Sequence, residues 1–213
     1  MGRFFREPAS GFSHLAGAVL SVAALVSLLC VAISNRDVWQ IVSFSIFGAS
    51  MILLYSASAT YHLINASEKV VKILQKIDHS MIFVLIAGTY TPICLTLLRG
   101  RLGYWLLALI WSCAAAGIVM KMFFFDIPRL LYTGIYMIMG WIAVFVIVPL
   151  YRAGGPLPLV WLLAGGLMYT AGGIIYAVKK PDLFPGWLGF HEIFHIFVIL
   201  GSAAHYVMIL RFC

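Results

Sequence analysis

Seven stretches of the 213-residue chain are long and apolar enough to cross a lipid bilayer. A helix needs about 20 mostly apolar residues to span the hydrocarbon core. The predicted spans are 14–33, 39–64, 78–98, 104–120, 130–150, 157–178 and 188–210. Charged residues, Gly or Pro separate each span from the next. The alternating pattern of a β-barrel is absent. The sequence therefore predicts an all-α membrane protein, with one seven-helix transmembrane domain over residues 1–213.

The composition supports this fold class and excludes several others. Apolar residues make up 63% of the chain and charged residues only 10%, too few to cover a water-soluble core of this size. The four cysteines are scattered, which argues against a disulfide scaffold. The net charge of +7 comes from residues between the apolar stretches. An anionic membrane surface is therefore the expected partner, and nucleic acid is not.

The distribution of Lys and Arg predicts the orientation, because cationic residues accumulate in cytoplasmic loops. With the N-terminus inside, nine fall on the inner side: Arg3, Arg6, Lys69, Lys72, Lys76, Lys121, Arg129, Lys179 and Lys180. Five fall on the outer side: Arg36, Arg99, Arg101, Arg152 and Arg211. The sequence thus favours a cytoplasmic N-terminus and an external C-terminus.

The longest inner loop, residues 67–77, has a helical pattern of its own. Apolar residues stand at 70, 74 and 77, and lysines stand at 69, 72 and 76. This pattern predicts a short amphipathic helix on the inner leaflet, with Ser67 as its N-cap. Two interpretations stay open: a simple connector, or a segment that recognises lipid headgroups.

Ionisable residues from three distant spans fall at one membrane depth. His62 ends the second span, Asp78 and His79 begin the third, and His191, Glu192 and His195 lie in the first turns of the seventh. Ionisable groups within spans are costly and are functional by default. The clustering does not depend on the orientation, since an inverted topology would move all of these residues together.

The histidines of this group have the spacing of metal ligands. His191 and His195 are four residues apart, which places both on one face of a helix. His62 is the candidate third ligand, and three neutral imidazoles with one open position are typical of catalytic zinc. Asp78 could hold metal-bound water, orient a histidine or ligate directly. Ser58, one turn before His62, can reach the same site.

The segment His191 to His195 also matches the His-Glu-x-x-His pattern of zinc proteases. A third ligand of the familiar kinds is missing, because Gly201 stands where one class has a histidine and no acidic residue follows Glu192. Glu192 is therefore expected to balance charge or to support a ligand.

The remaining histidines have less defined roles. His205 is 14 residues beyond His191, or roughly 21 Å along a helix, so we expect a hydrogen-bonded bundle residue. The roles of His14 and His79 stay open.

These segments resemble the bacterial hemolysin III group of the progestin and adipoQ receptor (PAQR) family, related to adiponectin receptors and alkaline ceramidases. The matching motifs are Ser-Ala-Ser-Ala-Thr-Tyr-His at 56–62, Asp-His at 78–79 and His-Glu-Ile-Phe-His at 191–195. The resemblance implies zinc near the cytoplasmic face, bound at His62, His191 and His195. It also implies that Asp78 holds zinc-linked water, that Ser58 belongs to the site, and that the protein resides in a bacterial inner membrane.

Three functions follow as hypotheses. The first is a zinc-dependent hydrolase of a membrane lipid amide, with its acyl chain between the helices. The second is a non-catalytic sensor or regulator of membrane state, in which zinc links helices. The third is cytolysis, the activity for which the resembling group is named. Catalytic turnover distinguishes the first from the second.

Overall fold

The protein is an all-helical bundle over the residues that the structure, a computed structural model, describes: 4–124, 128–183 and 188–213. Arg3 of the inner cationic set and residues 125–127 and 184–187 of the predicted separators lie outside this range. The helices are α1 (Pro8–Asn35), α2 (Val38–Leu63), α3 (Glu68–Leu95), α4 (Arg101–Phe123), α5 (Arg129–Trp141), α6 (Ile147–Gly154), α7 (Pro156–Val178) and α8 (Phe190–Phe212), with a 3₁₀ helix η1 (Ile142–Val146) between α5 and α6.

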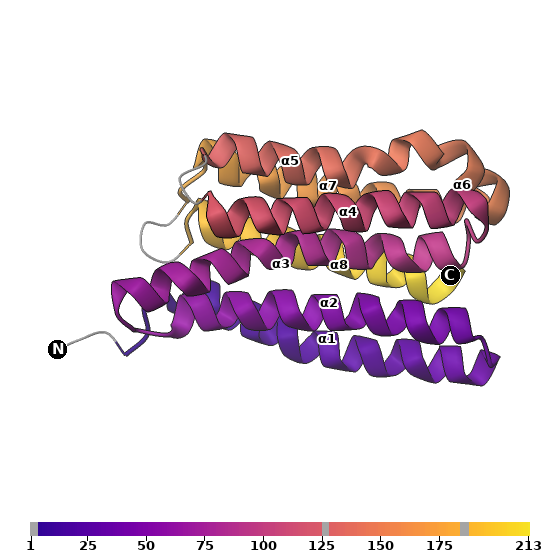
Figure 1. The fold of residues 1–213 in the computed structure, drawn as a ribbon. Coiled ribbons are helices and arrows are strands. Elements are labelled where there is room, and N and C mark those ends of the chain that lie inside the picture. Colours follow the sequence, from indigo (N-terminus) through magenta and orange to yellow (C-terminus); the bar gives the residue numbers. More distant parts are fainter. Residues whose placement is uncertain (1–3, 125–127, 184–187) are drawn as a thin grey trace.

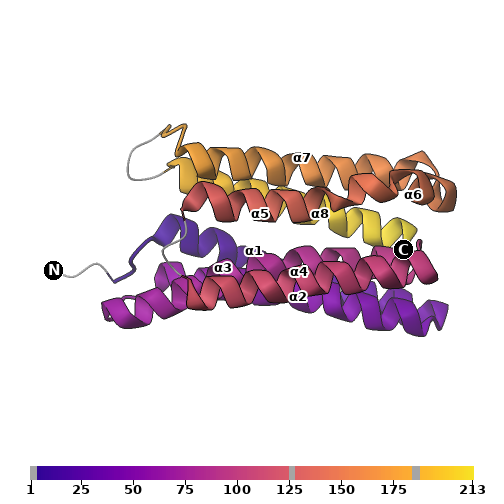
Figure 2. The same cartoon turned by 45° about the horizontal axis from the view of Figure 1, so that its top comes forward.

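The helices lie side by side along one direction, and the two chain ends are at opposite ends of the bundle (Figures 1 and 2). Helices α1, α2, α3 and α4 pack in sequence, each against the one before it. Helix α8 packs against α1 and α7, and α5 packs against α7 and α3. Helix α3 also contacts α8. This arrangement brings the end of α2 and the first turns of α3 close to the beginning of α8.

Six of the described helical segments are long and apolar enough to span a membrane: α1, α2, α4, the run from α5 to α6, α7 and α8. Their outward faces carry exposed large apolar side chains such as Ile138 and Phe145. Such surfaces need lipid around them, so the protein is an integral membrane protein. Helix α3, which carries Asp78, is not among the six segments.

Helix α3 differs from the prediction at its beginning. It runs without a break from Glu68 through Asp78, so the amphipathic segment is its first three turns and not a separate helix. Ser67 stands at the N-cap position, but its side chain makes no capping hydrogen bond. The lysines interrupt the apolar pattern but not the backbone hydrogen bonds, since Lys is a good helix former. These turns extend beyond the neighbouring α4 (Figure 1).

The fifth predicted span, 130–150, changes from α-helix to 3₁₀ helix in its middle and then back to α-helix. Residues Ile142–Val146 form a 3₁₀ helix between α5 and α6. The Tyr90 hydroxyl of α3 accepts a hydrogen bond from the Ala143 N–H at 2.7 Å and donates to the Gly140 carbonyl at 2.7 Å. A side chain from another helix thus satisfies backbone groups that the change of helix type frees.

Candidate metal centre

Most of the ionisable residues selected from the sequence meet at the end of the bundle where the N-terminus lies. His62 is in the last turn of α2, Asp78 is in the third turn of α3, and His191 and His195 are in the first two turns of α8. His62 and His195 are almost fully buried, with exposed fractions of 1% and 2%, and His191 is partly buried. The three imidazoles therefore form one buried cluster.

The geometry of this cluster fits a metal ion. One ring nitrogen from each of His62, His191 and His195 lies within 4.8 Å of the other two. The Nε2 atoms of His62 and His191 are 3.2 Å apart. Zinc–nitrogen bonds of about 2.0–2.1 Å place two tetrahedral ligands about 3.3–3.4 Å apart. The observed distance between the two Nε2 atoms is close to that ligand–ligand distance, so the residues present suit zinc.

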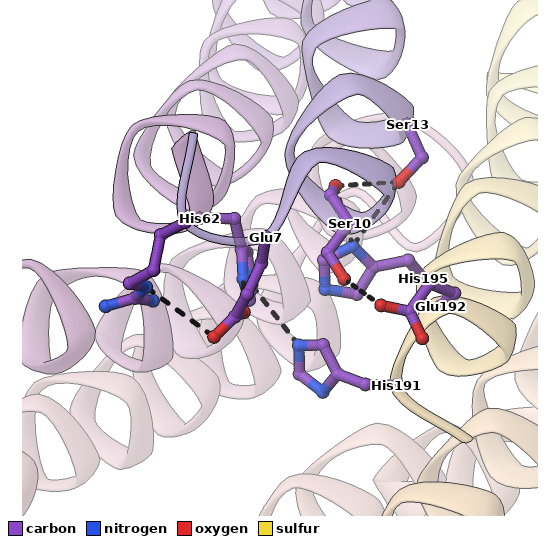
Figure 3. Close-up of polar contacts among 8 residues, drawn as sticks. Glu7, Ser10, Ser13, His62, His191, Glu192 and His195 are labelled. Atoms are coloured by element: carbon purple, nitrogen blue, oxygen red, sulfur yellow. Dashed lines mark hydrogen bonds and ion pairs between the residues drawn. The ribbon is translucent and has the colours of Figure 1, made fainter. Parts of the chain in front are cut away.

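Hydrogen bonds fix which nitrogen two of the histidines offer (Figure 3). The His62 Nδ1–H donates to the Glu7 carboxylate, and the His195 Nδ1–H donates to the Ser10 carbonyl at 3.2 Å. Both acceptors lack a proton, so each Nδ1 must carry one. The Nε2 lone pairs are then free for a metal ion, and such outer partners are typical of metal-binding histidines.

Glu192 occupies the position of the general base in the protease pattern but is held elsewhere. Its Oε1 accepts a hydrogen bond from the Ser10 hydroxyl at 2.6 Å, and its Oε2 accepts one from the Gly189 N–H at 2.9 Å. Glu192 therefore caps the beginning of α8 and joins it to α1. This agrees with the expected supporting role.

Asp78 and Ser58 lie beside the cluster without joining it. Both are buried, and their side chains interact with each other. Among the described residues, the group with metal-ligand geometry contains the three histidines and no carboxylate. Of the three roles considered for Asp78, the arrangement favours contact with a molecule bound at the metal.

The other histidines have distinct surroundings. The His14 ring stacks on His195, with ring centres 3.6 Å apart. The His79 ring lies 5.5 Å from the Tyr132 ring, and its backbone carbonyl accepts from the Tyr136 hydroxyl. His205 donates from Nε2 to the Leu162 carbonyl at 3.2 Å, as expected for a bundle residue.

A cavity of about 170 Å³ begins at the histidine cluster and continues between the helices. At the cluster its wall includes His191, His195, Asp78 and Ser58, and along α8 it reaches His205. The rest of the wall is largely apolar, with residues such as Leu85, Ile86, Val144, Ile147, Leu159 and Leu163. The cavity therefore joins a polar end to a long apolar space.

Two supporting residues, Glu7 and Ser10, were missed by the sequence reasoning. The Glu7 side chain is 45% exposed, and its hydrogen bond to His62 holds the pKa of the carboxyl below its usual value. One signal could have identified it, because Glu7 is the only acidic residue among the first 36. Ser10 supports His195 through its backbone, which leaves no mark in the sequence.

Comparison with known proteins adds a family assignment to this geometry. The model of a family described as haemolysin-III related matches residues 3–206. The hemolysin-3 homolog of Bacillus subtilis is 44% identical over 97% of this chain and 94% of its own length. Hemolysin-3 of Bacillus cereus is 41% identical over 99% and 93%. The human monocyte to macrophage differentiation factor is 24% identical over 97% and 90%. These matches confirm the family resemblance seen in the motifs.

Proposed function

The chain belongs to the haemolysin-III related family, and on that premise we propose that its three-histidine centre holds zinc and hydrolyses an amide bond in a membrane lipid. One observation carries the proposal. The apolar cavity ends at two of the three histidines and at Asp78 and Ser58. A lipid whose acyl chain filled the cavity would present its polar linkage to these groups.

The residues around the cavity supply the steps of such a hydrolysis. Zinc, when bound by His62, His191 and His195, would lower the pKa of water to about 7 and polarise a carbonyl group. Asp78 accepts the proton of the attacking water and delivers it to the leaving nitrogen. Once Asp78 holds that proton it no longer needs Ser58 as a donor, so the Ser58 hydroxyl donates to the oxygen that gains negative charge. The apolar wall aligns the acyl chain and limits access of bulk water.

The proposed function includes a defined placement in the membrane. We infer that α3 crosses as the seventh span, since it lies inside the bundle alongside α2 and α4. The N-terminus then faces the cytoplasm, in keeping with nine inner against five outer cationic residues. The metal centre opens toward the cytoplasmic leaflet of a bacterial inner membrane, the predicted location.

Release of free fatty acid from N-acyl lipids tests the proposal. The purified protein is reconstituted with a panel of such lipids, stripped of metal with a chelator and then reloaded with zinc. Fatty acid measured by mass spectrometry should appear, disappear on chelation and return with zinc. A zinc-loaded protein that releases nothing from the whole panel would exclude the hydrolase.

A non-catalytic sensor is the second candidate, favoured by the way the cluster joins helices. His62 comes from α2, His191 and His195 come from α8, and hydrogen bonds tie both helices to α1. Zinc would then link α2 directly to α8, with α1 attached by hydrogen bonds, and would couple their packing to the state of the membrane. In that case zinc raises the thermal stability, but no lipid is turned over.

Cytolysis is the third candidate, and it is favoured by the names of the matching family and of the two Bacillus relatives. Erythrocytes exposed to the purified protein would release haemoglobin if this function applied. Equal release by a variant without metal ligands would separate lysis from the metal centre.

A further inference from the structure

We propose that Glu7 is a positioning residue of the metal centre, which holds His62 in the orientation and tautomer needed for metal binding. The inference rests on the proposed metal centre and extends it to a helix that contributes none of the three histidines. Glu7 lies immediately before α1, yet it is in contact with the last turn of α2 (Figure 3).

The beginning of α1 fixes the backbone of Glu7. Pro8 occupies the first helical position, where its missing N–H costs nothing and where it disfavours a helical conformation for the residue before it. Glu7 is thus the last residue outside the helix, and its carbonyl accepts from the Gly11 N–H at 3.0 Å. Its own N–H donates to the His62 carbonyl at 2.9 Å. Glu7 therefore contacts His62 through both backbone and side chain.

A close approach of α1 to α2 makes this double contact possible. A Cβ atom added to Gly11 would lie 2.5 Å from the Leu63 side chain and 3.4 Å from the His62 Cβ. Only glycine allows the helices to meet at this distance without a shift. Because Glu7 is about one helical turn from Gly11, the same contact brings its carboxylate to the His62 ring.

The carboxylate contributes two effects at His62. By accepting from Nδ1–H, it leaves the lone pair on Nε2, which is the atom that faces the Nε2 of His191. Its negative charge also offsets part of the charge of a divalent ion that is bound only by neutral imidazoles. A proton on the wrong nitrogen would remove a ligand even if the ring stayed in place.

The corresponding support for His195 differs in one respect. There the acceptor is the backbone carbonyl of Ser10, which any residue at that position would supply. The Ser13 hydroxyl of α1 also lies near the His195 Nδ1, at 3.5 Å. For His62 the acceptor is the Glu7 side chain, which substitution can remove. Arg6 lies beside it, with Nε 3.5 Å from the Glu7 carboxylate and the guanidinium 4.2 Å from the Tyr61 ring centre.

Zinc affinity of Glu7 variants tests the inference, measured by competition with a chromogenic chelator on the purified full chain. Glu7→Ala removes both effects, whereas Glu7→Gln keeps an acceptor for Nδ1–H and loses the charge. Loss of such a partner costs about 10–100-fold in metal affinity. We therefore expect Glu7→Ala to lose close to 100-fold in zinc affinity, and Glu7→Gln to have an affinity between those of Glu7→Ala and the wild type. Glu68→Gln is the matched control, because Glu68 is an exposed carboxylate at the same end of the bundle.

Cobalt(II) spectra separate positioning from a general loss of stability. In the tetrahedral site, cobalt gives strong visible absorption, which the Glu7 variants should weaken or shift while the metal-free variants unfold near the wild-type temperature. Lower stability of the metal-free protein with unchanged affinity and spectrum would overturn the inference. If Glu7→Ala does not fold, wild-type affinity in Glu7→Gln overturns it. A wild-type protein that binds no zinc overturns the metal centre itself, which is a different result.

Discussion

The Ser10 hydroxyl donates a hydrogen bond to Glu192 across 2.6 Å, and this contact joins the first turn of α1 to the first turn of α8. The second oxygen of Glu192 accepts the Gly189 N–H, so both oxygens have partners within the protein. The glutamate of the His-Glu-x-x-His pattern is therefore part of the framework around the histidines. The pattern shared with proteases thus has a different use here, because hydrogen bonds within the protein occupy both oxygens of its glutamate.

The first prediction concerns this glutamate. Glu192→Gln should keep zinc content and lipid hydrolysis, since an amide can still accept from one of the two donors. Glu192→Ala should lose about 1–2 kcal/mol of stability, the usual cost of removing a helix cap and a partly buried hydrogen bond. Metal analysis, fatty acid release and thermal unfolding measure these effects. A Gln variant with full zinc and no hydrolysis would make Glu192 the base.

The sequence predicted the histidine cluster because its signals are local. Two histidines four residues apart share a helix face whatever the rest of the fold does. His62 and Asp78 were added because each stands at the same end of its apolar stretch, and a bilayer turns that position into a depth. Residue spacing and hydropathy are therefore sufficient to predict that these histidines and Asp78 lie close together.

The support from α1 could not be predicted in the same way. Glu7 lies outside the apolar pattern and 55 residues from its partner His62, and its contact depends on the close crossing at Gly11. The 3₁₀ segment between α5 and α6 is a similar case, because Tyr90 of α3 completes its hydrogen bonds. Both features depend on side chains that become neighbours only after the helices pack.

The second prediction is the metal content of ligand variants. Purified protein should hold about one zinc per chain. His191→Ala and His195→Ala should abolish binding, and His62→Ala should reduce it strongly. His205→Ala is the control, since this buried histidine of the same helix bonds to Leu162 and lies outside the cluster. Full zinc in His62→Ala, measured by mass spectrometry of the metal, would remove His62 from the ligands.

The third prediction is the direction in which the centre opens. A reporter fused after Cys213 should be active in the periplasm, and one fused at the N-terminus should be active in the cytoplasm. The basis is that nine Lys and Arg fall on the side of the bundle that holds the N-terminus and five on the other side. The two chain ends also lie at opposite ends of the bundle (Figure 1). Cytoplasmic activity of the Cys213 fusion would invert the topology and turn the centre toward the outer leaflet.

The fourth prediction separates a catalytic from a structural metal centre at Asp78. Asp78→Asn keeps the shape of the side chain and can still hydrogen-bond with Ser58, but it cannot accept a proton. If Asp78 is the general base, the variant should keep most of its zinc and its thermal stability.

Hydrolysis by the same variant should fall by roughly 10²–10⁴-fold, the usual contribution of a general base. If Asp78 instead binds the metal directly in a closed site, zinc and stability should be lost together. Zinc content, unfolding temperature and fatty acid release, measured on one preparation, distinguish the two cases. Among the described residues, the group with metal-ligand geometry does not include Asp78, and this favours the first case.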